Sequence, residues 1–143
     1  MELINFAKDH GLKTCIRSGG VDTIDKVVCE ELGMTGYLCN RLIEKDGVLT
    51  GETTGPGGGE ILDASGKRRA LDMLCMLYGL HHSQAIAGGD GANDLEMIKT
   101  AGLGFAYHGK PIVAASAPYR VNHGGLDVII NLFVESWDKA RKL

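Results

Sequence analysis

Two carboxylates and an amide directly follow an apolar run in the middle of the chain. Residues 85–89 (AIAGG) have the character of a short buried strand, and Asp90, Asn93 and Asp94 come at the glycine turn that ends it. Both carboxylates stand where a helix is expected to begin, so the helix dipole favours their charge. Carboxylate and amide oxygens suit a hard cation such as Mg²⁺. The segment therefore predicts a magnesium site with Asp90 and Asp94 as metal ligands.

A simpler explanation exists for the same residues. Asn93 or Asp94 would serve as the N-cap of the following helix, beside an acidic turn. Three glycines (Gly88, Gly89 and Gly91) favour the metal site, because they leave room for a ligand to approach the backbone. Spacing alone leaves both explanations open.

A second polar segment, Ser18-Gly19-Gly20, lies between an expected strand and an expected helix. A hydroxyl and free backbone N–H groups at a helix start form a cradle for an anion such as phosphate. The alternative is that Ser18 only caps the helix.

A third segment places Lys67, Arg68 and Arg69 at the start of an expected helix. Cations there oppose the helix dipole by up to ~0.3–1 kcal/mol each when exposed. A bound phosphate facing Lys67 would compensate for this. The alternative is a solvated basic turn balanced by Asp63. His108 and His123 are expected in loops at the same active edge, where they are weaker candidates for ligand contact.

Helical and strand patterns alternate along most of the chain. Helices are expected over 2–10, 21–32, 66–78, 92–101, 110–116 and 126–137, and strands over 12–17, 85–89, 103–107 and 119–121. An Asp-Gly turn joins strands 37–44 and 48–52 as a hairpin. Ser65 is the expected N-cap of helix 66–78, and the glycine-rich residues 53–59 are the most flexible stretch. In the second helix the apolar residues share one face (Val21, Ile24, Val27, Val28 and Leu32).

This alternation predicts an α/β fold in which helices cover both faces of a parallel sheet, a three-layer Rossmann-like arrangement with a β-hairpin insertion. Ligands in such sheets bind at the carboxyl ends of the strands. The Ser18 and Asp90 turns are both expected at that edge.

Length and composition exclude several classes of protein. The 143 residues suit one domain, 1–143, and the net charge of −3 argues against a nucleic-acid partner. No apolar run approaches the ~18 residues of a membrane span, and the first residues lack the pattern of a signal peptide. The cysteines (Cys15, Cys29, Cys39 and Cys75) are expected as reduced thiols in a cytoplasmic protein.

Taken together, these segments resemble the haloacid dehalogenase superfamily and, within it, the phosphoserine phosphatases. Residues 89–94 (GDGAND) look like the acidic fourth motif of the superfamily, and Ser18-Gly19-Gly20 looks like its second, phosphate-binding motif. Lys67 falls where the third-motif lysine is expected. Residues 39–51 are similar to the hairpin of phosphoserine phosphatases, and 101–111 to their following strand. The resemblance covers residues 2–133.

The resemblance implies Mg²⁺-dependent hydrolysis of a phosphomonoester through an aspartyl-phosphate. It assigns Lys67 a catalytic role and phosphate contact to Lys67, Ser18, Gly19, Gly20 and Asn93. It assigns Asp90 and Asp94 to the metal.

The sequence departs from the superfamily in one respect that affects catalysis. The nucleophile motif, Asp-x-Asp-x-Thr, should stand upstream of Ser18, but no Asp-x-Asp occurs in the chain. The helical cap that follows this motif is absent too, and Val21 replaces a frequent phenylalanine. We therefore expect a phosphatase core that is inactive alone, or a non-catalytic phosphate- or metal-binding or assembly protein of the same descent. An incomplete product is a third explanation.

In the superfamily the missing strand is central and lies between the strands expected at 12–17 and 85–89. Without it both strands keep unpaired edges, which is costly in a core. We expect a rearranged sheet, a homodimer formed by strand complementation, or a separate chain that carries the nucleophile motif.

Overall fold

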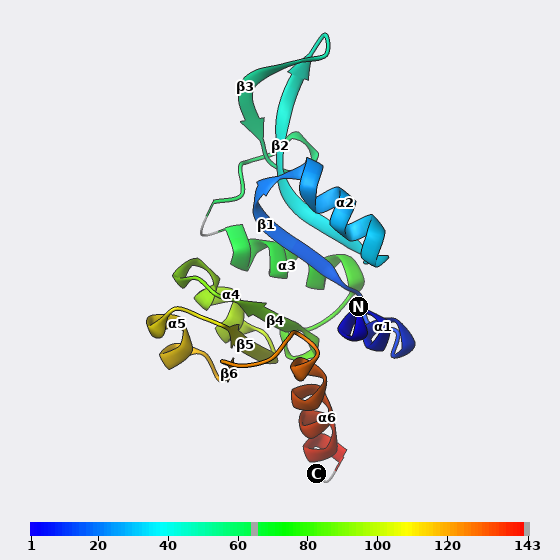
Figure 1. Cartoon of the computed structure of the whole chain (residues 1–143), viewed down its shortest axis with the longest axis vertical. Coiled ribbons are helices and arrows are strands. Elements are labelled where there is room, and N and C mark those ends of the chain that lie inside the picture. The colour runs from blue at the N-terminus through cyan, green and yellow to red at the C-terminus, as the bar shows by residue number, and fades with distance from the viewer. Residues whose placement is uncertain (64–65, 142–143) are drawn as a thin grey trace. The chain divides into compact units, whose positions relative to one another are not determined.

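The computed structural model describes residues 1–63 and 66–141, so the expected N-cap Ser65 lies outside the described residues (Figure 1). The chain divides into two compact units, Leu3–Ala70 and Leu71–Leu143, with Met1 in the first and Glu2 in the second. Each unit contains its own three-stranded sheet. The single domain expected from the length stays a prediction.

The first unit combines two helices with a mixed sheet in the order β1-β2-β3. Its elements are α1 (Glu2–Asp9), β1 (Cys15–Val21), α2 (Asp22–Leu32), β2 (Gly36–Lys45), β3 (Val48–Thr54) and the 3-10 turn η1 (Pro56–Gly58). β1 and β2 are parallel, whereas β2 and β3 are antiparallel. Figure 1 shows the β2–β3 hairpin projecting beyond α2. The expected hairpin insertion is confirmed.

The backbone conformation of the hairpin turn explains why the hairpin could be predicted from the sequence. Asp46 and Gly47 both have positive φ values, 54° and 79°. A two-residue turn with both central residues in the left-handed region matches the twist of the flanking strands, and Asp-Gly is a favoured pair for it. Local residue chemistry therefore fixes the register beside the turn, and the register shifts further along, between Leu42 and Glu44.

Helix α2 turns its apolar stripe away from the sheet. It packs against β1 and β2, yet Ile24 is 68% exposed and Val27 is 49% exposed, whereas Cys29 is buried. The sequence also placed Val21 in this stripe, but Val21 is the last residue of β1 and the helix begins at Asp22. Within the described residues of this unit, no element covers Ile24 or Val27 enough to bury it.

The second unit is built on a parallel sheet in the order β4-β5-β6. Its elements are the helix α3 (Gly66–Tyr78, which begins in the first unit), η2 (His82–Gln84), β4 (Ile86–Gly89), η3 (Ala92–Asp94), α4 (Leu95–Thr100), β5 (Leu103–Tyr107), α5 (Pro111–Ser116), β6 (Tyr119–Val121) and α6 (Val128–Arg141). The expected helix 92–101 begins as a single 3-10 turn before it becomes α4. No described helix combines the length and the hydropathy needed to cross a membrane.

The core of this unit surrounds its central strand, β5. Leu103, Phe105 and Ala106 are buried on both faces of the sheet, as expected for a central parallel strand. One apolar cluster joins α3 to β4 and the end of α4 (Leu71, Cys75, Ala87 and Ala101). Another joins α4, β5 and α5 (Ile98, Ala106 and Val113). These clusters hold the carboxyl ends of β4 and β5, where the acidic turn begins.

Both strands that were expected to flank the missing strand are edge strands. β1 is the edge of the first sheet and β4 is the edge of the second. Ile86 in β4 is 38% exposed. An edge strand presents unpaired N–H and C=O groups, which are a template for another strand.

The contact between Gly88 and Phe105 gives a test of this packing. The two residues are cross-strand partners, and a Cβ atom on Gly88 would overlap the Phe105 ring. We expect Gly88→Ala to lower the free energy of unfolding by about 1–3 kcal/mol, the usual cost of overpacking a core. Urea unfolding measures this. The control is Gly36→Ala in β2, where a Cβ meets no atom within 4 Å. Equal stabilities of the two variants would contradict the packing described.

The thiol of Cys39 makes stability depend on pH. Burial raises its pKa to about 11, and the neighbouring Asp25 carboxylate acts in the same direction. A thiol in the unfolded chain ionises near ~8.5, so it loses its proton before the folded one does. The stability contributed below ~8.5 is therefore lost as pH rises to about 11. We expect the free energy of unfolding to fall over this range, and to fall less steeply in Cys39→Ala. Parallel urea titrations of both proteins would show it, and identical slopes would rule it out.

Candidate functional site

Ser18, Gly19 and Gly20 form a bulge inside β1, not the turn between strand and helix that the sequence predicted. Arg17 pairs with Leu38 and Val21 pairs with Asn40, so four steps along β1 match two along β2. The Gly20 N–H donates to the Ser18 hydroxyl oxygen at 2.9 Å. The register of β2 forces this bulge, which no local pattern reveals. Bulges re-aim side chains beside functional sites.

The start of α3 lies against this part of β1, within the first unit. The Arg17 guanidinium donates from Nη2 to the Asp63 carbonyl at 2.7 Å, and a Cβ on Gly66 would lie 3.1 Å from the same nitrogen. Ser18 follows Arg17, and the half-buried Lys67 follows Gly66. The structure thus brings together the two segments that carry the expected phosphate-binding serine and lysine.

Acidic side chains balance the basic start of α3. Arg69 pairs with Glu60 at 3.0 Å and with Asp63 at 3.6 Å. The Asp63 carboxylate also accepts the Gly66 N–H at 3.0 Å, so it satisfies one of the free donors at the helix start. The balance by Asp63 that the sequence suggested is present, and Glu60 extends it.

Asn40 supports the same region and was missed by the sequence reasoning. It is 7% exposed, accepts the Leu62 N–H at 2.8 Å and donates to the Leu62 carbonyl at 3.3 Å. A buried amide must find such partners. Asn40 therefore fixes the segment that leads into Asp63 and α3. The presence of an amide side chain next to Cys39, in a run of residues that otherwise favours a strand, was the sequence feature that could have identified Asn40.

In the second unit, the acidic turn is held by Asp94. This residue is only 2% exposed, and its Oδ2 accepts the N–H groups of Asp90 at 3.2 Å and Gly91 at 3.0 Å. A Cβ on Gly89 would overlap the Asp94 carboxylate. The glycine was expected to leave room for a ligand; here that room is filled by Asp94 itself.

Asp90 is placed differently from Asp94. Its side chain is exposed at the carboxyl end of β4, while its N–H is held by Asp94. Asn93 is exposed beside it. In the described ranges, no group of three or more His, Cys, Asp or Glu side chains gathers around a common centre. A hard cation that takes one or two carboxylates and retains its waters fits this donor set, whereas an all-protein metal cage does not.

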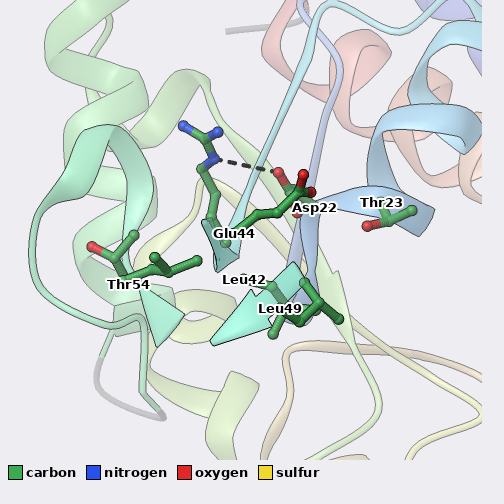
Figure 2. A pocket seen from close by; sticks show the side chains of 8 residues that line it. Asp22, Thr23, Leu42, Glu44, Leu49 and Thr54 are labelled. Carbon is green, nitrogen blue, oxygen red and sulfur yellow. Dashed lines mark ion pairs between the residues drawn. The ribbon is translucent and has the colours of Figure 1, made fainter. Parts of the chain in front are cut away.

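Two open cavities of about 490 and 470 Å³ lie between the start of α2 and the hairpin, all within the first unit. They share Asp22 and Arg41, which form an ion pair at 3.4 Å. Figure 2 shows Asp22, Glu44 and Leu49 around the larger cavity. No sequence pattern predicted these cavities, because their walls come from segments far apart in the chain.

The comparisons with known proteins point to one family. The sequence model of the haloacid dehalogenase-like hydrolases matches residues 28–123. A phosphoserine phosphatase of Polaromonas sp. is 42% identical over 130 residues, which are 91% of this chain and 55% of that protein. The chain spans about half the length of such curated relatives.

Solved structures agree with this match. A probable phosphoserine phosphatase from Vibrio cholerae aligns with a TM-score of 0.88 at 34% identity, over 99% of this chain and 42% of that one. A phospho-aspartyl intermediate analogue of phosphoserine phosphatase aligns with a TM-score of 0.78 at 34% identity, over 92% of this chain and 61% of that one.

The residues matched by the family model include the hairpin, Lys67 and the Asp90–Asp94 turn. Ser18 lies before the first matched residue, but the structural alignment with the Vibrio cholerae protein covers 99% of the chain. The fold and the order of these segments agree with the resemblance found in the sequence. The chain therefore belongs to the haloacid dehalogenase-like hydrolases, and within them it is similar to the phosphoserine phosphatases.

Proposed function

We propose that this chain is the core of a Mg²⁺-dependent phosphomonoester hydrolase of the phosphoserine phosphatase type, which works only with a nucleophile from outside these 143 residues. The observation that carries the proposal is the acidic turn. Asp94 is buried and holds the backbone, so that the exposed Asp90 carboxylate stands at the end of β4. This is the edge where parallel sheets bind their ligands.

Each residue of the site has a role in this proposal. Asp90, with Asp94 beside it, would hold Mg²⁺, which when bound offsets negative charge on the phosphoryl group. Lys67 and the Ser18 bulge would contact the phosphoryl oxygens, together with Asn93. Such contacts supply most of what a protein contributes to phosphoryl transfer, because they stabilise charge at fixed positions.

The nucleophilic aspartate is not among these 143 residues, since they contain no Asp-x-Asp. A second copy of the chain lacks it too, so a homodimer would not supply it. We therefore favour a separate segment that forms a strand and ends in this motif. The free edges of β1 and β4 are the expected places for it to pair.

A non-catalytic role is the second candidate, and one set of contacts favours it. The Ser18 hydroxyl accepts the Gly20 N–H, and Glu60 and Asp63 balance Arg69. These groups are thus satisfied without a bound phosphate. In this case the turn at Asp90 would serve metal binding or assembly only.

Phosphoserine hydrolysis distinguishes the two functions. We expect no activity above background from the pure chain, because it lacks the nucleophile. Addition of the residues of the Polaromonas relative that lie outside the matched 130 should restore activity. Asp90→Asn should reduce the restored rate about 100-fold or more, the scale of losing one electrostatic contact in the transition state.

The matched control is Asp46→Asn, the same chemical change in the exposed hairpin turn, which should leave the restored rate unchanged. Activity of the pure chain would contradict the need for an outside nucleophile. An undiminished rate in Asp90→Asn would contradict its role at the metal.

Magnesium binding is measurable without catalysis. In calorimetric titrations we expect Mg²⁺ to bind the wild type and Asp46→Asn equally, and Asp90→Asn at least about tenfold more weakly, since a neutral amide replaces the charged ligand. Inorganic phosphate added with Mg²⁺ should release further heat. Negligible heats in the wild type would leave a structural role for the turn.

A further inference from the structure

The residue that directly follows β5 has an unusual backbone conformation. His108 has a φ of +44°, and among the described non-glycine residues only Asp46 of the hairpin turn also has a positive φ. Histidine adopts this region more readily than most residues, but the surrounding structure has to hold it there. The positive φ of Asp46 is explained by the two-residue hairpin turn in which it lies. The positive φ of His108 requires a different explanation.

Three contacts hold His108 and its neighbour Tyr107 against the last residue of β6 and the loop that follows it. The His108 N–H donates to the Val121 carbonyl at 2.8 Å, and its Nε2 lies 3.0 Å from the Gly124 carbonyl. The Tyr107 hydroxyl donates to the same carbonyl at 3.4 Å. Since a carbonyl only accepts, Nε2 must carry the hydrogen.

The same segment reaches the acidic turn two residues later. The Lys110 N–H donates to the Asp90 carbonyl at 3.1 Å. A Cβ on the intervening Gly109 would lie 3.1 Å from Ala106, so the path from His108 to Lys110 is tightly constrained. The Asp90 backbone is thereby fixed from two sides, by Asp94 at its N–H and by Lys110 at its carbonyl.

We propose that His108 is a positioning residue for Asp90. Its ring contact with Gly124 and its left-handed backbone turn the chain so that the Lys110 amide meets the Asp90 carbonyl. The Asp90 carboxylate is thereby aimed out of the turn. The consequence for Mg²⁺ rests on the proposed function, whereas the backbone clamp does not.

Two substitutions at His108 separate its backbone from its ring. His108→Gly adopts the positive φ without strain but removes the ring contact. His108→Asn also tolerates this φ and keeps an N–H donor. In the first unit, His10 also contacts a backbone carbonyl through its ring, with Nδ1 2.8 Å from the Phe6 oxygen, and it supplies the control His10→Ala.

Amide hydrogen exchange of Lys110 and calorimetric Mg²⁺ affinity are the two measurements. We expect His108→Gly to speed exchange at Lys110 about tenfold, since local opening becomes easier, and to weaken Mg²⁺ binding several-fold. His108→Asn should restore much of both, and His10→Ala should match the wild type.

Two results would overturn the proposal. One is wild-type exchange at Lys110 in His108→Gly. The other is faster exchange with unchanged Mg²⁺ affinity, because the clamp would then not aim the carboxylate. If the wild type binds no Mg²⁺, the proposed metal site fails, and the exchange rate of Lys110 alone decides the backbone clamp.

Discussion

A buried carboxylate that accepts two backbone N–H groups is the constraint on which this molecule's candidate site depends. Asp94 is removed from water almost completely, and an ionised carboxylate in that position needs compensating donors. The N–H groups of Asp90 and Gly91 provide them. This requirement determines the shape of the turn, excludes a side chain at Gly89, and sets the direction in which Asp90 leaves the end of β4.

The unpaired edges of the two sheets are the second constraint. β4 is short and apolar, and it has none of the charged or proline residues that usually protect an edge from pairing. A chain that matches about half the length of its relatives, and superimposes on them with TM-scores of 0.78 and 0.88, has the fold of those proteins without all of their residues.

The sequence predicted elements well wherever local chemistry decides the structure. The strand at 103–107 matches β5, because its continuous apolar residues bounded by turn residues allow few alternatives. The strand at 119–121, which follows Pro118, matches β6. The Asp-Gly hairpin was equally clear, since only certain residues tolerate its φ values. The residue types at Asp90, Asn93 and Asp94 were also sufficient to locate the acidic turn.

Features that depend on a distant segment were missed or misjudged. The bulge at Ser18 follows from the register of β2, and the clamp by Asn40 requires Leu62 to arrive from the other end of the hairpin. Periodicity found the apolar stripe of α2 but not its direction, because a stripe marks a face without saying what covers it. The glycines near Asp90 were correctly noted, but the group that fills their space is Asp94, which only the folded turn reveals.

This distinction also bears on what the acidic turn says about function. The hydrogen bonds described above for this turn lie within residues 89–94 and at Lys110, and they are bonds of the folded backbone that require no nucleophile. An intact turn therefore reflects the fold of the family and does not depend on catalysis. The Asp90 carboxylate is different, because folding makes no use of it in the described structure. Its exposed charge costs little stability, and a carboxylate at a strand end is the type of group that a hydrated hard cation, such as the Mg²⁺ proposed above, takes as a ligand.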